Sequence, residues 1–87
     1  MSAGAATIAT MQVVLYSRPG CHLCDVARQV IVAQRALTGF DFVEVDISGK
    51  DPLELEYGIR IPVVEIDGAE SFEIQVDPAE FARLVAT

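Results

Sequence analysis

The chain has 87 residues, which is enough for one domain but not for two. Its formal net charge of −7 disfavours nucleic acid as a partner, because phosphate binding requires clustered lysine and arginine. Hydrophobic residues make up 52 % of the sequence and tryptophan is absent, so we expect helices to cover a buried sheet of Val, Ile, Leu and Ala.

Small side chains dominate the first ten residues, and we interpret residues 1–10 as a disordered N-terminal extension. This segment lacks the basic start and the apolar run of a secretory signal. No apolar stretch of the sequence reaches the roughly 18 residues that a membrane-spanning helix needs. We therefore expect a cytoplasmic protein with no membrane partner and a single domain over residues 11–87.

The sequence of the first half of this domain predicts a strand, a long helix and a second strand. Residues 11–16 are apolar and β-branched, as in a short buried strand. Apolar residues then recur at helical spacing from residue 21 to about residue 37, and Gly39 is the predicted C-cap. Alternating apolar and acidic residues predict a strand over 40–47, parallel to the first because a helix connects the two. The apolar stripe of the helix consists of Leu23, Val26, Ala27, Val30, Ile31 and Leu37.

A short helix follows in the second half. Asp51 fits an N-cap, and Pro52 fits the first helical position, where its missing N–H costs nothing. The helix should then run over residues 53–57 and end at Gly58.

A hairpin and a last helix complete the predicted elements. Strands over 62–66 and 71–76 flank Asp67-Gly68, which is a strong signal for a two-residue turn. Asp77-Pro78 begins a helix that runs to about residue 85, with aspartate as N-cap and proline at the first position. The predicted order is therefore β-α-β-α-β-β-α, an α/β arrangement.

The two cysteines, Cys21 and Cys24, lie where the first strand ends and the long helix begins. Thiol–disulfide exchange needs a thiolate, and an ordinary cysteine with a pKa of about 8.5 is mostly protonated at neutral pH. A helix N-terminus stabilises an anion, so we expect the pKa of Cys21 to be lowered. Arg18 is expected to add a positive charge nearby and His22 a partial one.

Spacing gives the second cysteine its role. Residues three apart share a helix face, so Cys24 can reach the sulfur of Cys21. The predicted catalytic sequence is attack by Cys21 on a disulfide, followed by resolution of the mixed disulfide by Cys24. Two inert buried thiols are the structural alternative. Zinc binding needs four ligands, and the chain offers two cysteines and one histidine, so we predict no metal site within a single chain.

Three features together resemble the thioredoxin superfamily, in a form as short as a glutaredoxin. They are the strand–CHLC–helix unit, the segment 57–62 running into a Val-rich strand, and the terminal hairpin followed by a helix. The resemblance covers about residues 11–87. It implies a thioredoxin-like, glutaredoxin-like fold with a four-stranded mixed sheet of order 2-1-3-4.

The resemblance also implies site residues. Ile61-Pro62 should be joined by a cis peptide bond and pack beside Cys21, and the free backbone groups of Ile61 would pair with a substrate cysteine segment. Arg18, Ile61 and Pro62 are thus the expected substrate-binding residues. His22 is expected to tune the redox potential, as a histidine between the cysteines does in strongly oxidising members of the superfamily.

One feature of glutaredoxins is absent from the sequence. Glutaredoxins usually carry a Gly-Gly pair after the fourth strand, where glutathione docks, whereas residues 74–78 read Ile-Gln-Val-Asp-Pro. We therefore expect no cofactor, and glutathione as a reductant has no evident binding motif.

The leading interpretation is a monomeric thiol–disulfide oxidoreductase that acts on a disulfide-containing protein or a small thiol. Two alternatives remain open. One is a metal or iron–sulfur carrier that assembles four thiolates in a dimer. The other is a non-catalytic adaptor, since the concentration of acidic residues in the second half suits a charged docking surface.

Overall fold

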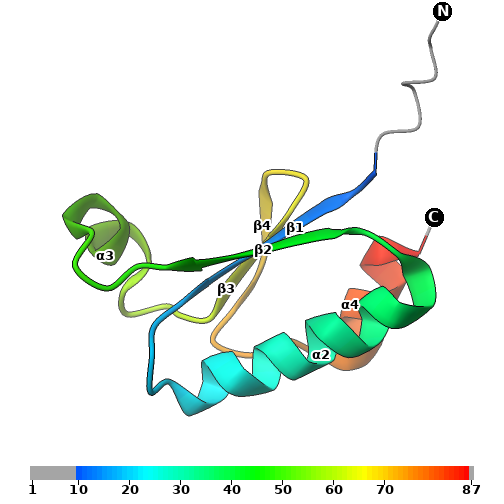
Figure 1. Cartoon of the computed structure of the whole chain (residues 1–87), viewed down its shortest axis with the longest axis horizontal. Helices are drawn as coiled ribbons and strands as arrows, with labels where there is room; N and C mark the ends of the chain where they lie inside the picture. The colour runs from blue at the N-terminus through cyan, green and yellow to red at the C-terminus, as the bar shows by residue number, and fades with distance from the viewer. Residues whose placement is uncertain (1–9, 87) are drawn as a thin grey trace, which may run out of the picture.

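The structure is a computed structural model that describes residues 10–86 (Figure 1). Within these residues the elements follow the predicted order β-α-β-α-β-β-α. They are β1 Gln12–Ser17, α2 His22–Thr38, β2 Asp41–Asp46, α3 Asp51–Tyr57, β3 Val63–Ile66, β4 Ala69–Glu73 and α4 Pro78–Val85. The predicted disorder of residues 1–10 concerns residues that, apart from Thr10, lie outside the described part of the chain.

The four strands form one mixed sheet of order β2-β1-β3-β4, so the predicted order 2-1-3-4 and the thioredoxin-like fold are confirmed. β1 runs parallel to β2, with Leu15 opposite Glu44. It runs antiparallel to β3, with Leu15 opposite Val64, and β3 continues antiparallel into β4. β1 is therefore a central strand, and its end leads directly into the cysteine segment.

One face of the sheet is covered by α2 and α4, which lie next to each other in Figure 1. Phe81 of α4 is fully buried there. Its ring meets Phe40 edge to face at 5.8 Å between centroids and lies 6.2 Å from Phe72. This packing holds α4 against the sheet, next to the end of α2. The core consists of Val13, Leu15, Ala27, Ile31, Phe40, Val64, Ile66, Val76, Phe81 and Val85.

The start of α3 differs from the prediction by one residue. The carbonyl of Lys50 accepts hydrogen bonds from the N–H groups of Leu53 and Glu54, each at 2.9 Å. Lys50 is therefore the N-cap and Asp51 is already helical, so the prediction of Asp51 as N-cap was wrong. Gly58 ends the helix as predicted.

The strand predicted over 71–76 was also wrong in its bounds. Asp67 and Gly68 both have positive φ, 51° and 85°, which gives a tight turn that lets pairing resume at once. β4 therefore begins at Ala69 opposite Ile66. It ends before Ile74, whose φ of 71° turns the chain out of the sheet.

Other local predictions are confirmed. Gly39 is the C-cap of α2, with a φ of 77° and an N–H group that donates to the carbonyl of Arg35 at 3.0 Å. Asp77 caps α4, and its side chain accepts a hydrogen bond from the N–H of Ala79 at 3.1 Å. None of the helices within residues 10–86 is long and apolar enough to cross a membrane.

Candidate redox site

The two cysteines meet at the start of α2. Cys21 is the N-cap, and the N–H of Cys24 donates to its sulfur at 3.1 Å. The pair forms a disulfide, with the Cα atoms 5.2 Å apart, which is a normal separation for a bridge. The fold thus brings together the two thiols that the sequence singled out, and the pair is capable of redox chemistry.

Exposure differs sharply between the two thiols. Cys21 is partly exposed, whereas Cys24 is completely buried within the first turn of the helix. Only Cys21 can therefore be reached by a bulky substrate while the fold stays intact. His22 is exposed beside it.

The side chain of Arg18, expected to place its charge near Cys21, forms an ion pair with α3. Its guanidinium donates to Glu54 Oε1 at 3.2 Å, and both side chains are a little over one-third exposed. The second carboxylate oxygen of Glu54 accepts from the N–H of Gly49 at 2.8 Å. The charge of Arg18 is thus largely balanced by a carboxylate, which reduces its expected effect on Cys21.

The predicted cis bond between Ile61 and Pro62 is confirmed. Pro62 is buried, and its carbonyl accepts a hydrogen bond from the N–H of Ile74 at 2.8 Å. Within the described residues, the backbone N–H and carbonyl of Ile61 take part in no backbone hydrogen bond. These two groups are therefore free to pair with another chain.

A tyrosine pair holds the segment before this proline. The rings of Tyr16, on β1, and Tyr57, at the end of α3, stack with centroids 4.0 Å apart. Both hydroxyls donate to Glu65 on β3, at 3.2 Å and 3.1 Å. Burial raises the pKa of both tyrosines, and the carboxylate of Glu65 raises each pKa further. The end of α3 is thus tied to the sheet just before the Ile61-Pro62 bond. Local sequence pattern does not predict this network, because Tyr16 is 49 residues away from Glu65 in the chain.

A second network anchors the first turns of α2. Ser17 donates to Glu44 at 2.6 Å, and the guanidinium of Arg28 binds the two oxygens of Glu44 at 2.6 Å and 2.5 Å. Arg28 also pairs with Asp25 at 2.8 Å. The hydrogen bonds from Arg28, and then the one from Ser17, lower the pKa of Glu44. The carboxylate therefore joins the helix to the ends of β1 and β2.

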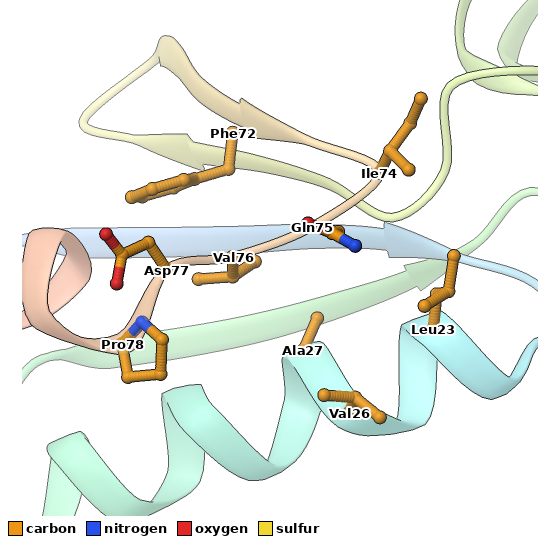
Figure 2. A pocket seen from close by; sticks show the side chains of 9 residues that line it. All are labelled: Leu23, Val26, Ala27, Phe72, Ile74, Gln75, Val76, Asp77 and Pro78. Atoms are coloured by element: carbon orange, nitrogen blue, oxygen red, sulfur yellow. The ribbon is translucent and has the colours of Figure 1, made fainter.

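An open cavity of about 420 Å³ extends to Leu23, the residue that lies between the two cysteines in the sequence (Figure 2). We call it the α2 groove, because the first two turns of α2 form one wall and the chain that follows β4 forms the other. Leu23 and Val26 are each 41 % exposed there, and Leu37 is 82 % exposed, so the predicted apolar stripe is only partly buried. The groove is lined by Leu23, Val26, Ala27, Phe72, Ile74, Gln75, Val76, Asp77 and Pro78.

The described residues contain no group of three or more His, Cys, Asp or Glu side chains that could hold a metal ion.

Comparison with known proteins shows the family. The family model described as "Glutaredoxin-like domain (DUF836)" matches residues 12–86. The N-acetyl-S-hydroxy-L-cysteine reductase of Bacillus subtilis is 31 % identical over 68 residues, which cover 72 % of this chain and 69 % of the reductase.

Solved structures show the same fold. The X-ray structure of protein XcR50 from X. campestris has a TM-score of 0.71 and 30 % identity, and the match covers 84 % of this chain and 93 % of that one. A mutant thioredoxin from Halobacterium salinarum has a TM-score of 0.66 at 18 % identity, over 92 % of this chain and 75 % of the thioredoxin. The chain therefore belongs to the glutaredoxin-like (DUF836) family, with a thioredoxin-like fold and a CxxC pair that can form a disulfide.

Proposed function

We propose that the protein is a thiol–disulfide oxidoreductase in which Cys21 is the nucleophile and Cys24 the resolving thiol. The observation that carries the proposal is the contrast between the two sulfurs. Cys21 is partly exposed at the helix start, and Cys24 is fully buried yet close enough to form a bridge, with 5.2 Å between Cα atoms. A non-catalytic adaptor with inert thiols would not require one exposed and one buried sulfur.

Electrostatics support the nucleophilic role of Cys21. Its sulfur sits at the N-terminus of α2, a helix of 17 residues, where free N–H groups and the helix dipole stabilise an anion. The N–H of Cys24 already points at this sulfur from 3.1 Å. Burial in an apolar core disfavours the charged thiolate of Cys24, so this thiol stays protonated until it attacks the mixed disulfide.

The reaction balances as a two-electron transfer. The thiolate of Cys21 attacks one sulfur of a substrate disulfide, forms a mixed disulfide and expels the other sulfur as a thiolate. Cys24 then loses its proton and attacks the sulfur of Cys21, which releases the second substrate thiolate. The two thiolates take up two protons, and the protein is left with the Cys21–Cys24 disulfide, which an external thiol donor must reduce.

The neighbouring residues suggest how a substrate is held. We assign the free backbone groups of Ile61 to pairing with the extended segment around the substrate sulfur, as in strand addition. Pro62 would close the floor of this position, and Arg18 would contact the substrate from the preceding turn. The exposed His22 would tune the redox potential of the pair.

The same chemistry extends to sulfenic acids. The Bacillus subtilis relative is named for the reduction of N-acetyl-S-hydroxy-L-cysteine. Attack of a thiolate on an S–OH group forms a mixed disulfide and, with one proton, releases water, after which the second thiol resolves the mixed disulfide as before. A small oxidised thiol is therefore a substrate class to test alongside protein disulfides.

The setting we propose is a reducing cytoplasm, where the protein acts as a monomer without a resident cofactor, on a disulfide-containing protein or a small thiol. Neither nucleic acid nor a membrane is an expected partner.

The test is a comparison of two isosteric variants. Wild-type protein, kept reduced with dithiothreitol, should reduce insulin or a small disulfide, and Cys21→Ser should abolish this activity. Cys24→Ser should instead accumulate a mixed disulfide with one substrate thiol, seen as an added mass by mass spectrometry. Full activity in Cys21→Ser would refute the assignment.

The two alternatives have their own readouts. Full cellular function of a double variant that lacks both thiols would favour the adaptor. A coloured, metal-containing dimer after anaerobic purification would favour the iron–sulfur carrier.

A further inference from the structure

Two tyrosines precede the two segments that form the candidate site. Tyr16 lies near the end of β1, the strand that leads to Cys21. Tyr57 is the last residue of α3, after which the chain leads to Ile61 and Pro62. Figure 1 shows α3 at the same end of the sheet as the start of α2. The two rings stack with 4.0 Å between centroids and 12° between their planes, so this contact joins the two segments.

Glu65 on β3 connects both tyrosines to the sheet. Its Oε1 accepts a hydrogen bond from the hydroxyl of Tyr16 at 3.2 Å, and its Oε2 accepts one from the hydroxyl of Tyr57 at 3.1 Å. All three residues are half-buried, and a hydrogen bond away from water is stronger than one at an exposed site. One carboxylate therefore holds the end of α3 against β1 and β3.

Backbone hydrogen bonds connect Tyr57 to the residue before the cis bond. The N–H of Arg60 donates to the carbonyl of Tyr57 at 2.8 Å, and the carbonyl of Arg60 accepts from the N–H of Ile74 at 3.1 Å. The carbonyl of Pro62 accepts from the same N–H at 2.8 Å. Ile61 thus lies between two residues that are held by hydrogen bonds, while its own N–H and carbonyl make no backbone hydrogen bond within residues 10–86.

The side chain of Arg60 provides a second, weaker contact for the same segment. Its guanidinium pairs with Glu70 at 2.8 Å and with Glu73 at 3.2 Å, both on β4. These two glutamate side chains are 42 % and 52 % exposed, and exposed ion pairs contribute little to stability. We therefore attribute the position of the segment mainly to the half-buried hydrogen bonds of Glu65.

We propose that Glu65 is a positioning residue of the redox reaction, which acts through Tyr57 to keep the backbone groups of Ile61 in a fixed position for substrate pairing. This inference rests on the proposed oxidoreductase function. Because the N–H and carbonyl of Ile61 pair with peptide groups, the effect is confined to peptide and protein disulfides. A small disulfide without peptide groups needs Cys21 but not Glu65.

The test compares two substrates in single turnover, with fully reduced protein and excess substrate. One is the symmetric disulfide of a short uncharged peptide with an internal cysteine. The other is bis(2-hydroxyethyl) disulfide, which has no peptide groups. The dependence of the rate on the concentration of the peptide disulfide separates its half-saturating concentration from its maximal rate.

Two variants weaken the contact by different amounts. Glu65→Val removes both acceptors and keeps a residue that suits a strand. It should raise the half-saturating concentration of the peptide disulfide about fivefold at an unchanged maximal rate, because a less ordered segment must be fixed when the peptide pairs with it. Tyr57→Phe keeps the ring stack and loses one hydrogen bond, so the increase should be about twofold. Bis(2-hydroxyethyl) disulfide should react at the wild-type rate in both variants.

Two further variants are controls. The amide of Glu65→Gln can accept a hydrogen bond from one tyrosine hydroxyl and donate one to the other, so this variant should keep nearly the wild-type half-saturating concentration. Glu80→Gln breaks a carboxylate ion pair with Arg83 on α4, and it should leave the kinetics of both substrates unchanged. Alkylation of Cys21 by neutral iodoacetamide, measured in each protein, corrects for any change in thiol reactivity.

Three results would overturn the inference. An equal loss of rate with both substrates in Glu65→Val and Tyr57→Phe would leave Glu65 with a structural role only. An unchanged half-saturating concentration in these two variants would remove the positioning role altogether. Either result leaves the oxidoreductase function standing, whereas failure of the wild-type protein to reduce either disulfide would overturn the positioning role and the proposed function together.

Discussion

The ionisation of Cys21 can be measured in isolation in a Cys24→Ser variant. This substitution removes the second thiol but keeps the backbone N–H at residue 24, which lies 3.1 Å from the sulfur of Cys21. Because serine is nearly isosteric with cysteine, we expect the start of α2 to keep its conformation. The variant therefore reports what the helix start does to one thiol.

The expected magnitude follows from two contributions. A charge at a helix terminus gains about 0.3 to 1 kcal/mol from the helix dipole. A hydrogen bond from a backbone N–H to a charged group adds about 1.5 to 3 kcal/mol. Since Cys21 is partly exposed, we take the lower part of these ranges, about 2 kcal/mol in total. That figure multiplies the ionisation constant of the thiol by roughly 30.

The assay is alkylation by iodoacetamide as a function of pH, followed by mass spectrometry. The midpoint for Cys21 should lie well below the value of about 8.5 for an ordinary cysteine. Cys21→Ser serves as the matched variant and reports Cys24 alone, whose complete burial should slow its alkylation at pH 7 at least tenfold. A midpoint for Cys21 at or above about 8.5, or equal rates in the two variants, would refute the electrostatic argument.

Three further predictions concern the surroundings of the pair. Glu54→Gln leaves the guanidinium of Arg18 without the carboxylate at 3.2 Å, so alkylation of Cys21 at pH 7 should speed up about twofold, and an unchanged rate would show that Arg18 is too far away to matter. Glu44 has a lowered pKa, so it stabilises the fold above its ordinary pKa of 4.5, and this contribution is lost as the pH falls through its lower folded-state pKa. In urea unfolding, Glu44→Gln should therefore cost about 1 kcal/mol at pH 7 and lose less stability than wild type between pH 5 and about pH 3, whereas parallel pH profiles would contradict this. Gly68 has a φ of 85°, and a Cβ at this position would meet no atom within 4 Å, so Gly68→Ala should cost about 1 kcal/mol through backbone conformation alone, without changing the thiol kinetics.

Features of the fold that depend on neighbouring residues were predictable. Asp67-Gly68 was identified as the hairpin turn, and Asp77-Pro78 as a helix start, because each pair determines its own backbone conformation. The end of β4 was not predictable in this way. Ile74 belongs to an apolar run that resembles a strand, but its N–H bonds the carbonyls of Arg60 at 3.1 Å and Pro62 at 2.8 Å. These partners come from another part of the chain, and local pattern carries no information about them.

The residues of the candidate site also differ in whether neighbouring residues or distant ones determine their place. Cys21 and Cys24 were found because their spacing and position before a helix are local properties, and the cis bond at Pro62 was found through the family resemblance. The partner of Arg18 was not found, because Glu54 lies 36 residues away and becomes a neighbour only when α3 packs at the end of the sheet. The effect of a charged side chain on a nearby thiol therefore cannot be predicted from sequence when its ion-pair partner is distant in the chain.

The α2 groove reflects which residues of α2 face the sheet. Cys24, Ala27 and Ile31 are the buried residues of α2, and with a period of 3.6 residues they define one narrow line along the helix. Once this line faces the sheet, Leu23 and Val26 must project to one side of it, where each remains 41 % exposed. Periodicity shows that a helix has an apolar side, but the width of the covering sheet decides how much of that side is buried. In α2 the apolar side is wider than the part that the sheet covers, and the exposed part includes Leu23, which lies between the two cysteines in the sequence. The apolar wall of the groove is therefore formed by Leu23 and Val26, which lie beside the buried line of α2 and not on it.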